Sequence, residues 1–183
     1  MPITTLDPNT ALVVIDMQKG IVALSTAEPV APVIDQVATL VRAFRSAGRP
    51  VVIVNVAGRA PGRTQQVNNF TPPPDWAVLI PELDVQPGDH LVTKLQLGAF
   101  VGTSLEQFLR RKGITQIVLC GIATSIGVES TARQAFDLGF NIAFATDAMT
   151  DLNAEAQANS LARIFPRLGE LGSTAELLAL LKA

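Results

Sequence analysis

The chain has 183 residues, of which 48% are hydrophobic and 16% charged, which is the composition of an ordinary globular domain. Its net charge of −2, without a basic block, argues against nucleic acid as a partner. The apolar runs are too short to span a membrane, and residues 1–10 lack the segments of a signal peptide, so we expect a cytoplasmic protein.

Buried strands and an amphipathic helix alternate along the first half of the chain. The run ALVVIDM, residues 11–17, is apolar and rich in β-branched residues, as in a strand buried within a parallel sheet. Apolar residues at helical spacing predict a helix over residues 32–47, which Gly48 ends. A strand over 50–56 follows, and then a long irregular loop over 57–76, a kind of loop that is usually functional or mobile.

The second half continues the alternation. The motif TSLE at residues 103–106 matches a capping box, and Ser125 or a neighbour is expected to cap a later helix. The elements predicted here are strands over 90–94, 115–122 and 141–149, and helices over 103–112, 125–138, 153–165 and 173–181. This order predicts one doubly wound α/β domain over residues 1–183, a Rossmann-like three-layer fold with a mostly parallel sheet of about six strands.

Polar residues at the carboxyl ends of the strands are the candidates for a site, because ligands bind there in such folds. They are Asp16, Gln18, Asn55, Arg59, Lys94, Ser125 and Asp147. Asp16 and Lys94 could form a buried acid–base pair, although a turn aspartate and a solvated lysine are the simpler interpretation. Burial would raise the pKa of Asp16 and Lys94 would lower it, so the sequence leaves open whether Asp16 is an acid or a base.

The segment GIATSIGVEST, residues 121–131, joins a predicted strand to a helix. Its backbone N–H groups could stabilise an anion, or it could be an ordinary capped turn. Arg59 and Trp76 of the long loop could line a pocket, but a solvated arginine and a loop anchor are equally ordinary interpretations. Cys120 lies in an apolar strand and is expected to be an inert hydrophobic residue.

Metals and cofactors have no support in the sequence. The chain has a single histidine, His90, and a single cysteine, which do not provide the ligands of a zinc site. There is no dinucleotide-binding glycine motif, no Walker loop and no GxSxG motif. We therefore expect a metal-independent protein without a cofactor that binds a small molecule.

Taken together, the segments VVIDMQ, NVAGRAPG, DWAVLIPEL, TKLQLGAFVGTSLEQFLRRKGI and IVLCGIATSIGVESTARQAFDLGF resemble the isochorismatase-like hydrolase superfamily over nearly the whole chain. Most of its members are cysteine hydrolases that cleave small amides with an Asp-Lys-Cys triad. The resemblance assigns the catalytic aspartate to Asp16 and the lysine to Lys94. The position of the cysteine falls on Gly127, so the nucleophile is missing.

The true isochorismatases also carry glycine at this position and hydrolyse a vinyl ether by acid catalysis. The resemblance therefore implies a hydrolase that acts on a small, carboxylate-bearing substrate, with Asp16 as acid/base, Lys94 stabilising charge, and Ile126 and Gly127 lending N–H groups. Five residues are expected to line the pocket beside Ile126: Gln18, Arg59, Trp76, Ile122 and Ala123. It also implies a cis peptide at Ile122–Ala123 and a homo-oligomer, dimeric or higher.

Two alternatives stay open at this point. True isochorismatases resemble GVYAHIG at this turn, whereas the chain reads GIATSIG, as cysteine hydrolases do. The chain could thus be an inert family member that binds a small molecule or a protein partner. It could also be an amide hydrolase whose nucleophilic cysteine has been replaced at Gly127.

Overall fold

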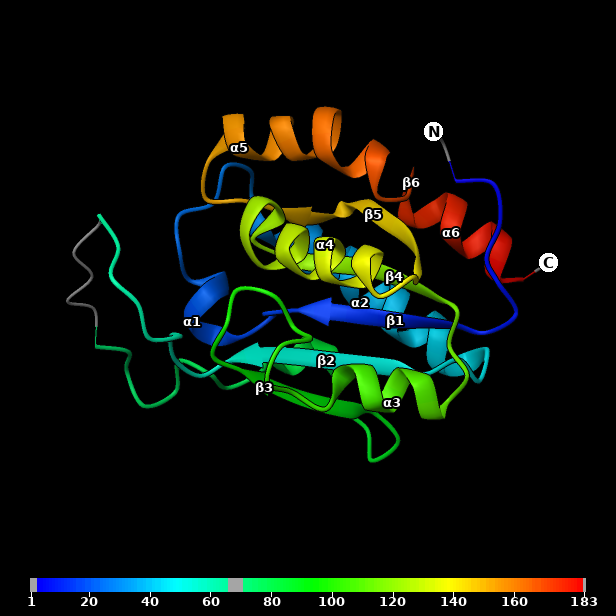
Figure 1. The fold of residues 1–183 in the computed structure, drawn as a ribbon, viewed down its shortest axis with the longest axis horizontal. Coiled ribbons are helices and arrows are strands. Elements are labelled where there is room, and N and C mark those ends of the chain that lie inside the picture. The colour runs from blue at the N-terminus through cyan, green and yellow to red at the C-terminus, as the bar shows by residue number, and fades with distance from the viewer. Residues whose placement is uncertain (1–2, 66–70, 183) are drawn as a thin grey trace.

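The computed structural model describes residues 3–65 and 71–182 and shows one sheet with helices on both faces (Figure 1). The strands lie in the order β3-β2-β1-β4-β5-β6, and all of these neighbours pair in parallel. The chain thus builds outward from β1 to β3 and then returns to the other side of β1, as in a doubly wound fold. The predicted α/β fold is confirmed, with a sheet that is wholly parallel among the described strands.

The strands follow the apolar runs of the sequence. Their bounds are β1 Thr10–Ile15, β2 Val51–Val56, β3 His90–Lys94, β4 Gln116–Ile122, β5 Asn141–Thr150 and β6 Glu170–Gly172. Every residue of β1 and of β4 is buried, because these two strands form the middle of the sheet. The two strands approach closely at Gly121, which has a φ of 116°, and an added Cβ there would lie 2.0 Å from the carbonyl oxygen of Ile15.

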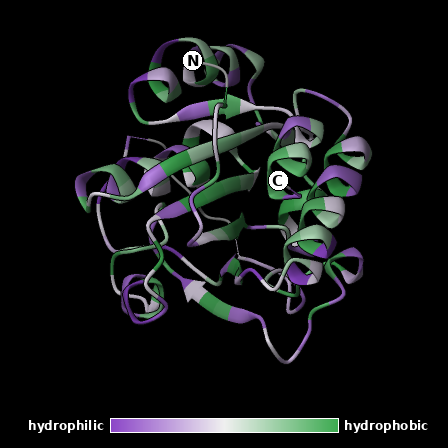
Figure 2. Cartoon of the chain, turned by 90° about the vertical axis from the view of Figure 1, so that its right-hand side faces the viewer, coloured by the Kyte–Doolittle hydropathy of each residue, from purple (hydrophilic) through white to green (hydrophobic). Residues whose placement is uncertain are grey.

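Alternate residues of β1 pack into two separate hydrophobic clusters, one on each face of the sheet. Leu12 and Val14 face the layer that contains α2 (Val30–Ser46) and α6 (Thr174–Leu181). Figure 2 shows hydrophobic segments both on the strands and on the helices beside them.

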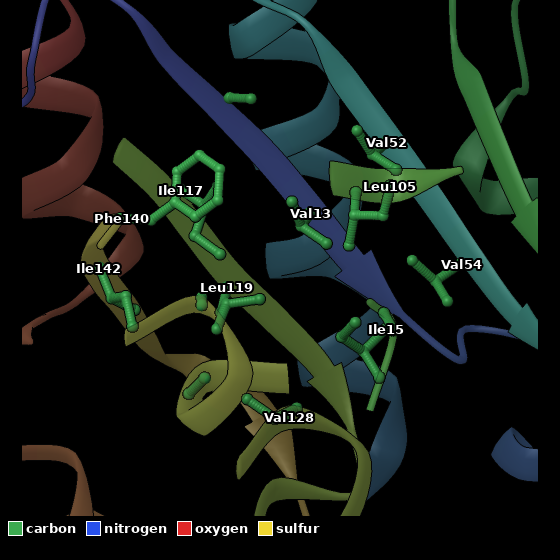
Figure 3. Packing of buried hydrophobic residues seen from close by; sticks show 14 of the residues in the cluster. Val13, Ile15, Val52, Val54, Leu105, Ile117, Leu119, Val128, Phe140 and Ile142 are labelled. Atoms are coloured by element: carbon green, nitrogen blue, oxygen red, sulfur yellow. The ribbon is translucent and has the colours of Figure 1, made fainter. Parts of the chain in front are cut away.

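The opposite face of the sheet carries α3 (Leu105–Arg111) and α4 (Glu129–Asp137). There Val13 and Ile15 of β1 join the same cluster as Leu119 of β4 and Val128, which precedes α4 (Figure 3). The two apolar layers hold the central strands rigidly, so that the strand ends can position a site.

The structure corrects several expected boundaries. Strand β1 ends at Ile15 rather than at residue 17, because Asp16 has a φ of 53° and leaves the extended conformation. The expected capping box at residues 103–106 is absent: Ser104 is the N-cap and its side chain makes no cap hydrogen bond. A capping box instead begins α6, where Ser173 and Glu176 bond reciprocally.

Short elements were missed because they contain too few residues to show a period. They are α1 (Lys19–Val22), a 3-10 turn over Pro81–Leu83, and β6. The single helix expected over 153–165 consists of α5 (Ala154–Asn159), a π-helical segment (Ser160–Ile164) and a 3-10 turn (Phe165–Arg167). Part of the expected loop over 57–76, residues 66–70, lies outside the described residues.

Candidate active site

Three neighbouring segments bring the expected catalytic residues together at one edge of the sheet. Asp16 directly follows β1, Lys94 ends β3, and Gly127 lies in a π-helical turn, Thr124–Val128, that follows β4. Because the strands are parallel, their carboxyl ends meet at the same edge. Asp16, Lys94 and Gly127 all line one cavity there.

Asp16 and Lys94 form a buried ion pair. The side chains of Asp16 and Lys94 are 7% and 2% exposed, and Lys94 Nζ donates to Asp16 Oδ2 over 2.8 Å. Lys94 Nζ also donates to the carbonyl oxygens of Gln96 and Leu97, at 3.2 and 3.0 Å. Both residues were expected at a strand end, and the structure supports the buried pair over the solvated alternative.

The pKa of the Asp16 carboxyl group lies close to neutral pH. Burial raises the pKa of Asp16 from 3.8 to about 6, while the charge of Lys94 and its hydrogen bond oppose the rise. The second oxygen, Oδ1, is buried and has no hydrogen-bond partner among the described atoms. Desolvation thus outweighs the cation, and about one Asp16 in ten is protonated at pH 7.

Gly127 packs directly beside this carboxyl group. A Cβ built on Gly127 would lie 3.2 Å from Asp16 Oδ2 and 2.9 Å from Ile15 Cγ2. The φ of Gly127 is not positive, so the backbone does not require glycine there. A side chain at this position would pack against the carboxylate, and the Ile15 methyl group would have to shift to admit it.

The backbone of the turn after β4 is already well bonded. The peptide between Ile122 and Ala123 is cis. The amide of Ser125 donates to Asp151 Oδ2 over 2.5 Å, and that of Ile126 donates to the carbonyl of Ala123 over 3.2 Å. Ser125 therefore does not cap the helix through its side chain, and the N–H of Ile126 is engaged rather than offered to a ligand as expected.

The cavity has a volume of about 680 Å³, which suits a small molecule. Among the described lining residues the charged ones are Asp16, Lys94 and Arg59, and the guanidinium of Arg59 donates to Thr64 Oγ1 over 2.7 Å. The other walls are mostly apolar and include Ile21, Leu24, Val56, Leu95, Leu97, Ile122, Ala123, Ile126 and Leu152. Arg59, Ile122, Ala123 and Ile126 therefore line the cavity, and that they bind a substrate stays a prediction.

Gln18 and Trp76 are not among the residues that line the cavity, which corrects the expectation for both. Gln18 is fully buried, and its amide nitrogen donates to the carbonyls of Val56 and Trp76 at 3.0 and 2.9 Å. Its amide oxygen accepts from the N–H of Val56 over 2.8 Å. The ring of Trp76 lies against Gly20, where an added Cβ would be 2.1 Å from a ring carbon. Both residues anchor the loop after β2.

The aspartate that supports the site is Asp151, not Asp147. Strand β5 continues to Thr150, so Asp147 lies within the strand, where its carboxylate accepts from the N–H and hydroxyl of Thr174. Asp151 is 1% exposed, binds the amide of Ser125, and accepts from the N–H of Asn153 through Oδ1. The strand-end rule would have found Asp151 if the end of β5 had been placed correctly.

Cys120 and His90 have structural surroundings. Cys120 is completely buried, and burial raises the pKa of its thiol. The His90 ring stacks on Phe108 at a centroid distance of 3.9 Å. Within residues 3–65 and 71–182 there is no cluster of three or more potential metal ligands. No described helix is long and apolar enough to cross a membrane.

Known proteins resemble this chain in sequence and in fold. The family model described as isochorismatase domain matches residues 10–176. The isochorismatase family protein YwoC of Bacillus subtilis is 46% identical over 182 residues, which cover 95% of each chain. The ureidoacrylate amidohydrolase RutB of Pseudomonas syringae is 30% identical over 170 residues, covering 76% of this chain and 69% of RutB. A solved structure of an isochorismatase family protein from Burkholderia thailandensis is 41% identical, with a TM-score of 0.88 and 98% of each chain covered.

Proposed function

The chain belongs to the isochorismatase family, a family of hydrolases, and we propose that it hydrolyses a small, carboxylate-bearing vinyl ether by acid catalysis. Asp16 is the acid, Lys94 stabilises its charge, and no covalent intermediate forms. The observation that carries the proposal is the state of the Asp16 carboxyl group. One of its oxygens is bound to an ammonium, and the other is buried without a hydrogen-bond partner among the described atoms.

The two oxygens of Asp16 suit two different tasks. Oδ2 accepts from Lys94, so a proton on the carboxyl group is best carried by Oδ1. A pKa of about 6 keeps part of the population protonated at neutral pH, and a general acid works best with a pKa near the working pH. After proton transfer, the ammonium stabilises the carboxylate that remains.

The reaction requires only a proton and water. Protonation of the terminal carbon of the enol ether by Asp16 gives an oxocarbenium ion. Water adds to its cationic carbon and returns a proton to the carboxylate. The hemiketal then breaks its bond to the alkoxy oxygen, which leaves as an alcohol, and a ketone remains. General acid catalysis of this kind contributes about 10²–10⁴-fold, and positioning in the cavity supplies the rest.

The lack of a nucleophile at position 127 supports a mechanism without an acyl-enzyme. Covalent amide hydrolysis requires a thiol or hydroxyl beside an activating base. Gly127 offers neither, and the only thiol of the chain, Cys120, is buried within β4. The turn GIATSIG nevertheless resembles that of cysteine hydrolases, and RutB is named an amidohydrolase, so amides belong in any substrate panel.

The cavity wall favours an anionic substrate with an aliphatic body. Arg59 is a cation in the cavity outside the catalytic pair, and a guanidinium binds a carboxylate through two parallel hydrogen bonds. Aliphatic side chains such as Leu24 and Leu97 line much of the remaining wall. Arg59→Gln should therefore raise KM for a carboxylate substrate more than it lowers kcat.

The test is release of a keto acid from isochorismate and from simpler enol-pyruvyl ethers by the purified protein. Asp16→Asn should abolish release. Asp89→Asn is the matched control, because Asp89 is also a buried carboxylate in an ion pair, with Arg45, outside the cavity. That variant should lose stability but keep its turnover.

Three outcomes would contradict the proposal. Turnover that survives in Asp16→Asn would remove Asp16 as the acid. Hydrolysis of amides but not of enol ethers would assign a different reaction. Saturable binding of small carboxylates without turnover of any of them would favour an inert family member.

A further inference from the structure

Lys94 is fixed in place by the backbone that follows it. An ammonium has three N–H donors, and among the described atoms Lys94 has three acceptors, Asp16 Oδ2 and the carbonyls of Gln96 and Leu97. The position of the ammonium relative to Asp16 therefore depends on where the segment after β3 lies.

That segment is held by side chains of α4. Thr131 Oγ1 accepts from the N–H of Ala99 over 3.1 Å, and Gln134 Oε1 accepts from the N–H of Phe100, also over 3.1 Å. The Gln134 side chain also fills the space at Gly98, where an added Cβ would lie 2.4 Å from its oxygen. Residues 98–100 are thus attached to α4 rather than to the strand they follow.

The hydroxyl of Thr131 also bonds to the turn that contains Gly127. It donates to the carbonyl of Gly127 over 2.7 Å, and Thr131 is completely buried. A hydroxyl has one proton to donate, so the bond from Ala99 must use a lone pair. One buried atom therefore connects the turn after β4 with the segment that fixes Lys94.

We propose that Thr131 is a positioning residue that sets the spacing between the Gly127 turn and the Lys94 ammonium. It touches neither of the groups assigned to proton transfer, and it acts through the backbone on both sides of the cavity. The assignment rests on the proposed roles of Asp16 and Lys94, but its test does not require a substrate.

Loss of the hydroxyl frees the segment after β3 from the Gly127 turn. The two carbonyls that hold Lys94 then shift, and the ammonium moves away from Asp16. The N–H of Ala99 and the carbonyl of Gly127 are left without their partner, so the arrangement in which these two groups are buried side by side is disfavoured. The electrostatic effect of Lys94 on Asp16 weakens, whereas a merely structural role of Thr131 would leave it unchanged.

The variant is Thr131→Val, which keeps the shape of the side chain and removes both hydrogen bonds. Thr131→Ser restores the hydroxyl, and Thr150→Val is the matched control because the buried hydroxyl of Thr150 has no hydrogen-bond partner among the described atoms. The readout is the pH titration of the Asp16 carboxyl by ¹³C NMR, with its signal assigned from its absence in Asp16→Asn. Among the described residues, two charged side chains lie near Asp16: Lys94 contacts it, and Arg59 lines the same cavity. Neither of the two is substituted in these variants.

Thr131→Val should raise the pKa of Asp16 by about one unit, since an adjacent opposite charge lowers a carboxyl pKa by about 1–3 units. Thr131→Ser should restore the value of the unmodified protein, and Thr150→Val should leave it unchanged. If Thr131→Val does not fold, Thr131→Ala carries the same test, because it removes the hydroxyl without placing a methyl group against the Gly127 carbonyl. A folded variant without the hydroxyl whose Asp16 titrates normally would overturn the proposal, and so would an equal shift in Thr150→Val.

Discussion

Substitution of Asp16 by Asn should change how the stability of the protein depends on pH. The pKa of this carboxyl is raised from 3.8 to about 6 in the folded chain. A raised acid pKa means that folding disfavours the ionised form, so the group contributes most to stability at low pH. That contribution is lost as pH rises from about 3.8 through 6, and asparagine does not titrate.

The size of the effect follows from the shift. A rise from 3.8 to about 6 corresponds to about 3 kcal/mol over the whole titration. Between pH 4.5 and 8, a range convenient for unfolding experiments, the contribution of Asp16 to the free energy of unfolding changes by about 2 kcal/mol. The variant should fold, because Lys94 keeps the carbonyls of Gln96 and Leu97 as acceptors.

The assay is urea unfolding of the unmodified protein and of Asp16→Asn at pH 4.5, 6 and 8. The free energy of unfolding of the unmodified protein minus that of the variant should fall by about 2 kcal/mol as pH rises. Using this difference cancels the titration of all other carboxyl groups. A difference that is flat or rises with pH would refute the reasoning, because it would mean that Lys94 keeps Asp16 ionised and that Asp16 is a base.

Three further predictions concern the glycines and the cysteine. Gly127→Cys should fold with a small shift of the Ile15 methyl group. Its introduced thiol should react with iodoacetamide at pH 7, which mass spectrometry would detect. An unreactive thiol would mean that the cavity does not reach this position. Gly121→Ala should lower the free energy of unfolding by at least about 2 kcal/mol, because its Cβ would meet backbone; an unchanged urea midpoint would contradict the close approach of β4 to β1. The native protein should not react with iodoacetamide at Cys120, whereas the unfolded protein should take up one equivalent. Labelling of the native protein would show that β4 opens.

Much of the fold could be predicted from the sequence because its strands are buried on both faces. Runs such as residues 11–15 and 117–120 are apolar throughout, and helices between them force parallel pairing. The three-residue strand β6 and the four-residue α1 gave no periodic signal. The capping box at 103–106 was a sequence match that a competing local bond overrode, since the Thr103 hydroxyl donates to the carbonyl of Ala99, four residues earlier.

The Asp16–Lys94 ion pair was easier to predict than the residues around it. Asp16 and Lys94 are charged residues at the ends of apolar strands, and such charges are conspicuous in a sequence. The partners of Gln18 and Thr131 are backbone groups, which every residue carries, so no residue type indicates them. A sequence does not show how deeply Asp16 is buried. The rise in its pKa caused by burial could therefore not be compared with the fall caused by Lys94.

The position of β1 in the sheet bears on how the protein folds. The first strand of the chain is central, and its second neighbour, β4, begins at Gln116. During synthesis, an apolar strand therefore keeps one edge unpaired until more than half of the chain has left the ribosome, and such edges promote aggregation. The Asp16–Lys94 contact spans 78 positions and requires β2 and β3 to be docked, so it forms only in a chain whose sheet is assembled on that side. A nascent or truncated chain without β4 would also lack the Gly127 turn, so the proposed acid catalysis would require a completed sheet.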